Sequence, residues 1–213
     1  GSEMCIRDRR NNIPIEEKSA ARKRLGLPDC LTILSAGGSQ GASRLNEAVV
    51  QLLAYEQKKG NINHIHGYGK HGRDTFMQSL EDNGVDAGNP HFIIKEYIDN
   101  MYTCMCASDL IITRAGAMTL TEITAIGRAS VLIPYPYAAE NHQYYNALTL
   151  QNANAGRIID DKELTGSVLI DTVNRLADDP ELLRLMSENA AKLSKRDAAG
   201  KILREITELM GIK

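Results

Sequence analysis

An apolar, β-prone run that ends in a cluster of glycines is the feature that most constrains this chain. It reads Leu-Thr-Ile-Leu-Ser-Ala-Gly-Gly-Ser-Gln-Gly-Ala at residues 31–42, and a helical pattern follows it. In α/β proteins such a turn brings unpaired backbone N–H groups and the positive end of a helix dipole to one point, where a phosphate binds. Glycines there permit positive φ and close approach of a ligand. Such turns also serve only to pack a helix on a sheet, so both interpretations remain open at this point.

Composition excludes several classes of function. The chain has 213 residues, of which 43% are hydrophobic, enough for a sizeable core. The net charge is −2, and no stripe of Lys and Arg with interleaved aromatics is present, which disfavours nucleic acid as a partner. Trp is absent, which weakens base or sugar stacking on indole rings. No apolar run approaches the roughly 20 residues that cross a bilayer, so we expect a protein that is soluble or at most peripheral.

The cysteines and histidines do not predict a metal site. The four cysteines are unevenly spaced, which favours reduced cytosolic thiols over a disulfide framework. Cys104 and Cys106 would point apart on a helix, and no second pair has zinc spacing. His64 and His66 would share one face of a strand, where we expect them to face solvent or a packed helix. The sequence also lacks an Asp-x-Asp pair that could clamp a metal on a pyrophosphate.

Three segments are expected along the chain. Residues 1–10 begin with Gly-Ser and match nothing that follows, so they are interpreted as a non-native leader. Residues 11–29 are expected to form a linker and a lead-in helix at 15–27. Residues 30–213 are expected to form one domain, including closing carboxyl-terminal helices.

Strands and helices alternate through that domain. Strands are predicted at residues 31–36, 61–66, 91–98, 109–113, 129–134 and 157–160. Helices are predicted at residues 45–59, 73–84, 100–107 with Asp99 as N-cap, after Gly116, and at 140–152, 164–177, 181–193 and 197–210. This alternation predicts an α/β fold, a Rossmann-like parallel sheet with helices on both faces. Because right-handed crossovers bring all strand-to-helix turns to one edge, the Gly37 turn, the Ile98 end, the Gly116 turn and the 134–142 loop should meet there.

Four motifs, taken together and in order, resemble the carboxyl-terminal half of the MurG family. They are Gly-Gly-Ser-Gln-Gly-Ala at 37–42, Glu-Tyr-Ile-Asp-Asn-Met at 96–101, Arg-Ala-Gly-Ala-Met-Thr-Leu-Thr-Glu at 114–122 and Glu-Asn-His-Gln-Tyr-Tyr-Asn-Ala at 140–147. The resemblance runs from about residue 25 to the end. That family adds N-acetylglucosamine from UDP-N-acetylglucosamine to lipid I, making lipid II for peptidoglycan. It implies the second of two Rossmann-like domains of a GT-B glycosyltransferase, the one that holds the donor.

The resemblance also implies a set of donor-binding residues. These are Gly38, Ser39, Gln40, Ile98, Ala117, Met118, Thr119, Glu122, His142, Gln143 and Asn146. By resemblance, residues 38–40 cover the phosphates and the main chain of Ile98 pairs with the uracil edge. The backbone of 117–119 meets the pyrophosphate and sugar, and Glu122 holds the ribose. The side chains of His142, Gln143 and Asn146 read the sugar hydroxyls. The family often has Gln-Gln where this chain has His142-Gln143.

Several of these residues also have structural interpretations. A carboxylate is an acceptor only, so Glu122 can accept from both ribose hydroxyls, although a Glu near a helix start is also stabilised by the dipole. Thr119 could be an N-cap. Gln143 and Asn146, three apart on one helix face, can address one ligand, although solvent-facing amides would have the same pattern.

The resemblance covers only a donor-binding half. The family's amino-terminal domain, with its acceptor groove and the expected catalytic base, has no counterpart, and Asn12-Ile-Pro14-Ile15 lacks the arginine of the family's Asn-Pro-x-Arg. We therefore expect no catalytic residue here, donor binding without a metal or other cofactor, and a chain that is inactive alone. The whole enzyme would be cytoplasmic and peripheral on the inner face of the plasma membrane, where the missing half would bind the lipid I acceptor.

Two other functions remain open. The chain could be a donor-binding subunit that needs a separate acceptor-binding membrane partner. It could also be a UDP-sugar epimerase, but that reaction needs acid and base groups around the sugar, for which only Glu140 and His142 are available. An unmatched apolar face in the last helix is a candidate homodimer contact; its residues are Ile202, Ile206, Leu209 and Met210.

Overall fold

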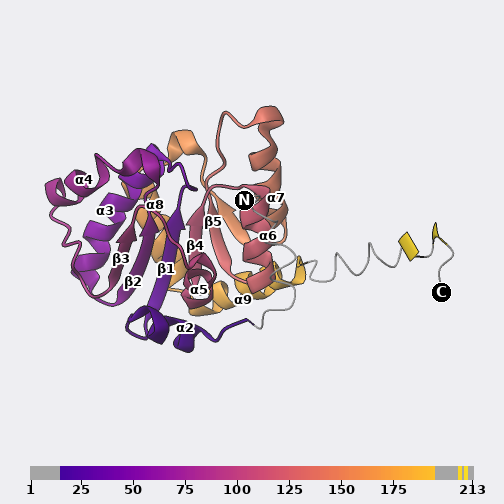
Figure 1. The fold of residues 1–213 in the computed structure, drawn as a ribbon, viewed down its shortest axis with the longest axis horizontal. Coiled ribbons are helices and arrows are strands. Elements are labelled where there is room, and N and C mark those ends of the chain that lie inside the picture. The colour runs from indigo at the N-terminus through magenta and orange to yellow at the C-terminus, as the bar shows by residue number, and fades with distance from the viewer. Residues whose placement is uncertain (1–14, 195–205, 208, 211–213) are drawn as a thin grey trace.

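The structure is a computed structural model, and it describes residues 15–194, 206, 207, 209 and 210. Six parallel strands form one sheet in the order β3-β2-β1-β4-β5-β6 (Figure 1). The strands are β1 (Leu31–Ala36), β2 (Ile62–Gly67), β3 (Phe92–Lys95), β4 (Leu110–Thr113), β5 (Ala129–Leu132) and β6 (Gly156–Ile158). The predicted Rossmann-like α/β fold is confirmed. The expected domain boundaries stay predictions, because the leader and most of the last helix lie outside the described residues.

Helices cover both faces of this sheet (Figure 1). They are α2 (Lys18–Leu25), α3 (Ser43–Lys59), α4 (Phe76–Asp82), α5 (Met101–Ala107), α6 (Ala117–Ile126), α7 (His142–Asn152), α8 (Gly166–Ala177) and α9 (Pro180–Lys192). Three short 3-10 turns interrupt the loops: η1 (Lys70–Gly72), η2 (Ala139–Asn141) and η3 (Asp161–Glu163). Every strand predicted from an apolar run is present, although β3 is shorter than expected.

One predicted N-cap is wrong, and so is one alternative interpretation. Asp99 is not the N-cap of α5: that position belongs to Asn100, whose carbonyl accepts from the Cys104 N–H at 3.1 Å. Thr119 is not the N-cap of α6, because the carbonyl of Gly116 already accepts from the Leu120 N–H at 3.0 Å. In both helices the two candidate residues have similar capping propensity, and the first backbone hydrogen bond shows where the helix begins.

The strand side chains alternate between two apolar layers. Ile33 and Ile112 point into the layer formed with α3, α4, α8 and α9. Leu34 and Ile111, one residue away in each strand, point into the layer formed with α2, α5, α6 and α7. A sheet covered on both faces needs apolar residues in both registers, which is why its strands are continuous apolar runs.

A buried polar network joins β1, β2 and α3 close to the end of β1. The Ser35 hydroxyl lies 2.7 Å from His64 Nε2 and 2.7 Å from His66 Nδ1, and His64 Nδ1 lies 2.7 Å from a Glu56 carboxylate oxygen. His66 also stacks on Phe76, with ring centroids 4.8 Å apart. The two histidines share one face of β2, as predicted, and they face packed helices rather than solvent.

Acidification should destabilise the fold through His66. Burial, reinforced by the neighbouring His64, lowers the pKa of His66 from 6.5 to about 3. Below about pH 6.5 the unfolded chain therefore binds a proton that the folded chain does not, and stability falls with pH toward 3 by roughly 1.4 kcal/mol per pH unit. Urea unfolding of the wild type and of His66→Phe at pH 7, 6 and 5 measures this. The free energy of unfolding of His66→Phe should fall less steeply with decreasing pH, because one proton fewer is taken up on unfolding. Equal slopes in the two proteins would show that His66 does not have the lowered pKa.

Candidate functional site

The turns singled out in the sequence lie at the carboxyl edge of the sheet. Ala36, the last residue of β1, pairs with Thr113, the last residue of β4, which in turn pairs with Leu132, the last residue of β5. The loops that follow these three strands therefore start side by side. The strand order reverses between β1 and β4, and this is where open parallel sheets of this kind bind their ligands.

The Gly-rich turn after β1 is held by backbone contacts with the turn after β2. The carbonyls of Ser39 and Gln40 accept from the N–H groups of Lys70 and His71 at 3.1 and 2.9 Å. Gly41 has a φ of +86°, and a Cβ on it would lie 2.4 Å from the Tyr68 carbonyl oxygen. These contacts fix the backbone of the turn while residues 38–40 remain exposed.

The amino end of α6 has no capping side chain. Its N-cap is Gly116, and Ala117, Met118 and Thr119 form its first turn, with the first two exposed. Among the described α-helices only α8 and α9 have a side-chain cap, from Thr165 and Asp179, so α6 differs from the other uncapped helices in its place at the carboxyl edge. A helix start without such a cap, at the edge of a sheet, favours an anion through its backbone N–H groups and its dipole.

Glu122 and Ile98 lie in different surroundings. Glu122 is half-buried on α6, a little over one turn from its start, and is not enclosed in the interior. Ile98 is only 5% exposed, and its side chain packs against Gly67 at the end of β2. A contact from Ile98 to a ligand would therefore come from its main chain, the kind of contact that the resemblance implies.

The α7 side chains hold the neighbouring loops together. The Gln143 side-chain oxygen accepts from the N–H groups of Ala115 and Tyr135 at 3.2 and 3.0 Å. The Asn146 amide donates to the Ala115 carbonyl at 3.3 Å. The interpretation of these two residues as solvent-facing amides is therefore wrong. His142 is exposed, and its Nδ1 donates to the Ala139 carbonyl at 2.8 Å.

The helix predicted at 140–152 begins at residue 142 in the structure, because the two residues before it have a non-helical backbone conformation. Glu140 and Asn141 have φ values of +51° and +55°, a left-handed conformation that is uncommon outside glycine. The chain turns sharply through these residues, and α7 begins at His142. Strained residues of this kind cluster at ligand-binding loops, and these two precede the residues expected to contact the sugar.

An ion cluster that the sequence did not predict ties this edge together. Arg114, directly after β4, pairs with Asp161 of η3 at 2.5 Å, and both side chains are only 14% exposed. Arg114 also donates to the Ile133 carbonyl at 3.2 Å, and Arg44 of α3 donates to the Asp161 carbonyl at 2.9 Å. The sequence held one signal for this cluster: a charged residue, Arg114, directly follows a strand that is buried along its whole length. The cluster therefore links the loops after β1, β4, β5 and β6.

No group of three or more metal-ligating side chains comes together in the part of the chain that the structure describes. Among the same residues, no helix is both long enough and apolar enough to cross a membrane.

Cys104 is buried, and burial raises its thiol pKa to about 11, which keeps it in the protonated, unreactive form.

The strand order, with its reversal between β1 and β4, defines a Rossmann-like domain. The chain belongs to glycosyltransferase family 28: residues 32–202 match the family's carboxyl-terminal domain. It is 38% identical over 183 residues to the UDP-N-acetylglucosamine--N-acetylmuramyl-(pentapeptide) pyrophosphoryl-undecaprenol N-acetylglucosamine transferase of Desulforamulus reducens. That match covers 85% of this chain and 49% of the relative. The enzyme of the same name from Desulfitobacterium hafniense is 39% identical over 202 residues, with 94% and 54% covered.

Solved structures agree with this assignment. MurG of Acinetobacter baumannii superposes with a TM-score of 0.73 at 29% identity, covering 91% of this chain and 54% of that one. The UDP-GlcNAc 2-epimerase of Neisseria meningitidis has a TM-score of 0.61 over 90% of this chain and 48% of that one, but at 12% identity it shows the fold alone. The chain spans about half the length of the relatives that it matches.

Proposed function

We propose that this chain is the half of a lipid II-forming glycosyltransferase that binds UDP-N-acetylglucosamine, the sugar donor. One observation carries the proposal: the Gly-rich turn after β1, the uncapped start of α6 and the loop before α7 all begin at the carboxyl edge, around the strand-order reversal. Membership in family 28 supports a glycosyl donor, and the names of the relatives supply the sugar nucleotide.

In this proposal the backbone stabilises the leaving group. The N–H groups of residues 117–119 and the turn at 38–40 surround the pyrophosphate, and the α6 dipole offsets the negative charge that develops on UDP during transfer. Glu122 accepts from the ribose hydroxyls, and the main chain of Ile98 pairs with uracil. No divalent ion or other cofactor is needed for donor binding.

The α7 residues act on the sugar partly through the loops. The Gln143 side-chain oxygen already accepts from two backbone N–H groups. The Gln143 side-chain NH₂ group is therefore the part that donates to a sugar hydroxyl. Asn146 positions Ala115 and presents its side-chain oxygen to the ligand. His142 contacts the sugar only through Nε2, because its Nδ1 donates to the Ala139 carbonyl.

The remaining steps need groups outside this chain. We propose that an amino-terminal half supplies the base and binds lipid I, whose undecaprenol lipid holds the whole enzyme at the cytoplasmic face of the membrane. A homodimer through the last helix is a separate proposal. Ile206, Leu209 and Met210 are exposed, and Ile202 lies outside the described residues.

Removing the Glu122 carboxylate should weaken UDP binding. Calorimetry with UDP, carried out in EDTA, should show Glu122→Ala binding about 1–3 kcal/mol more weakly than wild type, because charge-assisted bonds to the ribose are lost. Glu47→Ala, an exposed glutamate on α3, is the matched control and should bind like wild type. Unchanged affinity in Glu122→Ala would refute its role, loss of binding in EDTA would refute metal independence, and binding of NAD instead of UDP would overturn the proposed function.

A further inference from the structure

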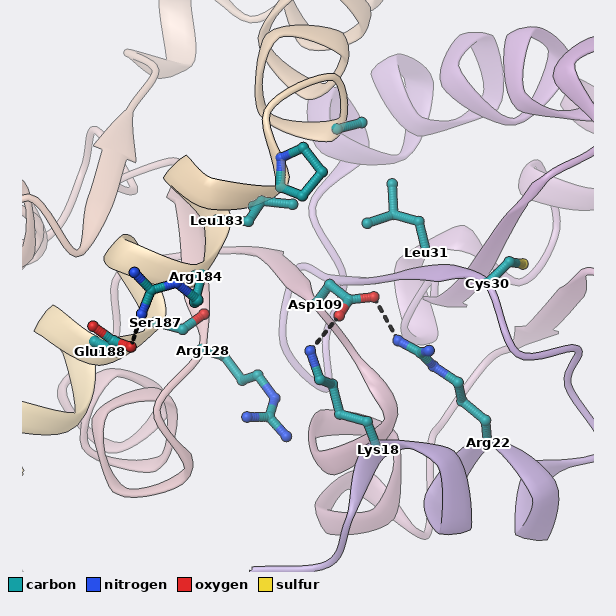
Figure 2. Close-up of a pocket in the computed structure, with 12 residues that line it drawn as sticks. Lys18, Arg22, Cys30, Leu31, Asp109, Arg128, Leu183, Arg184, Ser187 and Glu188 are labelled. Atoms are coloured by element: carbon teal, nitrogen blue, oxygen red, sulfur yellow. Dashed lines mark hydrogen bonds and ion pairs between the residues drawn. The ribbon is translucent and has the colours of Figure 1, made fainter.

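The charged side chains around a cavity of about 490 Å³, at the opposite, amino edge of the sheet, already have partners (Figure 2). Lys18 and Arg22 both reach to Asp109, and Arg184 pairs with two glutamates of α9. Arg128 donates to backbone carbonyls at the ends of α5 and α6. These contacts compensate the lining without a ligand.

A pair of exposed tyrosines lies at the carboxyl edge instead, in the loop between β5 and α7. Tyr135 is 44% exposed and Tyr137 is 83% exposed. Their ring centroids lie 5.6 Å apart, and the ring planes meet at 71°, so the two rings pack edge to face. Aromatic rings that remain this exposed beside a candidate ligand site favour a role in contacting the ligand.

The backbone of this loop is fixed in the conformation that presents the rings. The Tyr135 carbonyl accepts from the Ala138 N–H at 3.2 Å, which closes a four-residue turn. Pro136 is the second residue of this turn, a position that suits its fixed φ. Tyr137 therefore lies at the tip of a preorganised turn, and ordering its ring against a ligand costs little conformational entropy.

Two contacts bring the loop to the start of α6. The Gln143 side-chain oxygen accepts from the N–H groups of both Ala115 and Tyr135, so these two backbone positions meet on one atom. The guanidinium carbon of Arg114 lies 5.7 Å from the centroid of the Tyr135 ring. Arg114 and Ala115 directly precede the N-cap of α6, where the proposed function places the pyrophosphate. The sugar of a UDP-sugar is bonded to the second phosphate, so it leaves the start of α6 close to these rings.

We propose that Tyr137 packs the face of its ring against the N-acetylglucosamine ring of the donor, an inference that rests on the proposed function. In N-acetylglucosamine the ring substituents from C2 to C5 are equatorial, so axial C–H groups cover the faces of the sugar. The negative face of an aromatic ring attracts these hydrogens, and dispersion adds to the contact. Tyr135, held by Arg114 and Gln143, supports Tyr137 from the side. Tyr137 thus contacts the sugar and not the UDP part of the donor.

Calorimetry on the full chain with UDP and with UDP-N-acetylglucosamine tests this proposal. Tyr137→Ser should bind UDP-N-acetylglucosamine about fivefold more weakly than wild type and UDP with wild-type affinity, because only the sugar loses a contact. Tyr137→Phe keeps the ring and should bind both ligands like wild type. Tyr145→Ser is the matched control and should also bind both like wild type. It removes a 65% exposed tyrosine from α7, two residues after Gln143 and on a different side of the helix.

The outcomes separate this contact from the proposed function. Failure of the wild type to bind UDP would refute the donor-binding function and the contact with it. Wild-type binding of both ligands, with unchanged affinities in Tyr137→Ser, would refute the role of Tyr137 alone. Equal weakening of UDP and UDP-N-acetylglucosamine in Tyr137→Ser would also refute that role, because the loop rather than a sugar contact would then have changed.

Fluorescence gives a second readout, because the chain contains no tryptophan. Tyr137→Trp keeps an aromatic face at the tip of the turn and makes residue 137 the single source of tryptophan emission. UDP-N-acetylglucosamine should change this emission along a saturating curve that matches the calorimetric affinity, whereas UDP should leave it unchanged. An equal response to both ligands, or no response to either, would contradict a contact with the sugar.

Discussion

Replacing Gly41 with alanine should destabilise the fold by about 2–4 kcal/mol and abolish measurable UDP binding. The substitution has two costs, a left-handed φ of +86° for a residue with a Cβ and a Cβ placed 2.4 Å from the Tyr68 carbonyl oxygen. Since the clash is with backbone, the whole Gly-rich turn must retract. The hydrogen bonds from Lys70 to Ser39 and from His71 to Gln40 would then break. Urea unfolding and calorimetry with UDP measure the two effects.

Two other glycines with positive φ provide matched controls. Gly38 lies in the same turn with a φ of +92°, but a Cβ on it would meet nothing within 4 Å, so Gly38→Ala should cost only about 1 kcal/mol. Gly60 also has a positive φ, +70°, with open space around it at the end of α3, away from the turn, so Gly60→Ala should leave UDP affinity unchanged. If Gly41→Ala is no less stable than Gly38→Ala, the close approach of the two turns is not as described.

Replacing Arg114 with methionine should cost about 3 kcal/mol of stability and weaken UDP binding strongly. The change leaves the Asp161 carboxylate, only 14% exposed, with Arg44 as its remaining ionic partner at 3.7 Å. Removing one partner of a buried ion pair is costly, because the charge of the other partner stays buried without compensation. The loops after β4, β5 and β6 also lose their common anchor. Thermal unfolding and calorimetry with UDP measure both effects.

A double variant distinguishes the ion pair from simple packing. Arg114→Met/Asp161→Asn removes the stranded charge and should recover part of the stability lost in Arg114→Met. Arg73→Met breaks the exposed bidentate pair with Glu96 and should stay close to wild-type stability, because solvent screens that pair. Equal losses in Arg73→Met and Arg114→Met would show that burial of the Arg114 pair contributes nothing.

The strands and the edge that carries the candidate site could be predicted because they depend on local patterns. Leu110–Thr113 and Ala129–Leu132 are short apolar runs next to turn residues, and such runs form strands buried on both faces. The helix start after Gly116 was predicted correctly, whereas the N-cap of α5 was mispredicted by one residue, because Asp99 and Asn100 have similar capping propensity and only the backbone decides between them. The left-handed pair Glu140 and Asn141 was not predicted, because Asn adopts this conformation more readily than most residues but Glu does so rarely.

By itself the sequence determined the order of strands and helices, the glycines at the two turns and the membership in a family of glycosyltransferases, because these follow from residue type and spacing. Only the tertiary structure decided that Gly41 packs against Tyr68, that Gln143 holds two loops, and that Arg44 and Arg114 share Asp161. Arg44 and Asp161 are 117 residues apart. Contacts of that kind depend on how helices pack against a finished sheet, and no local pattern records them.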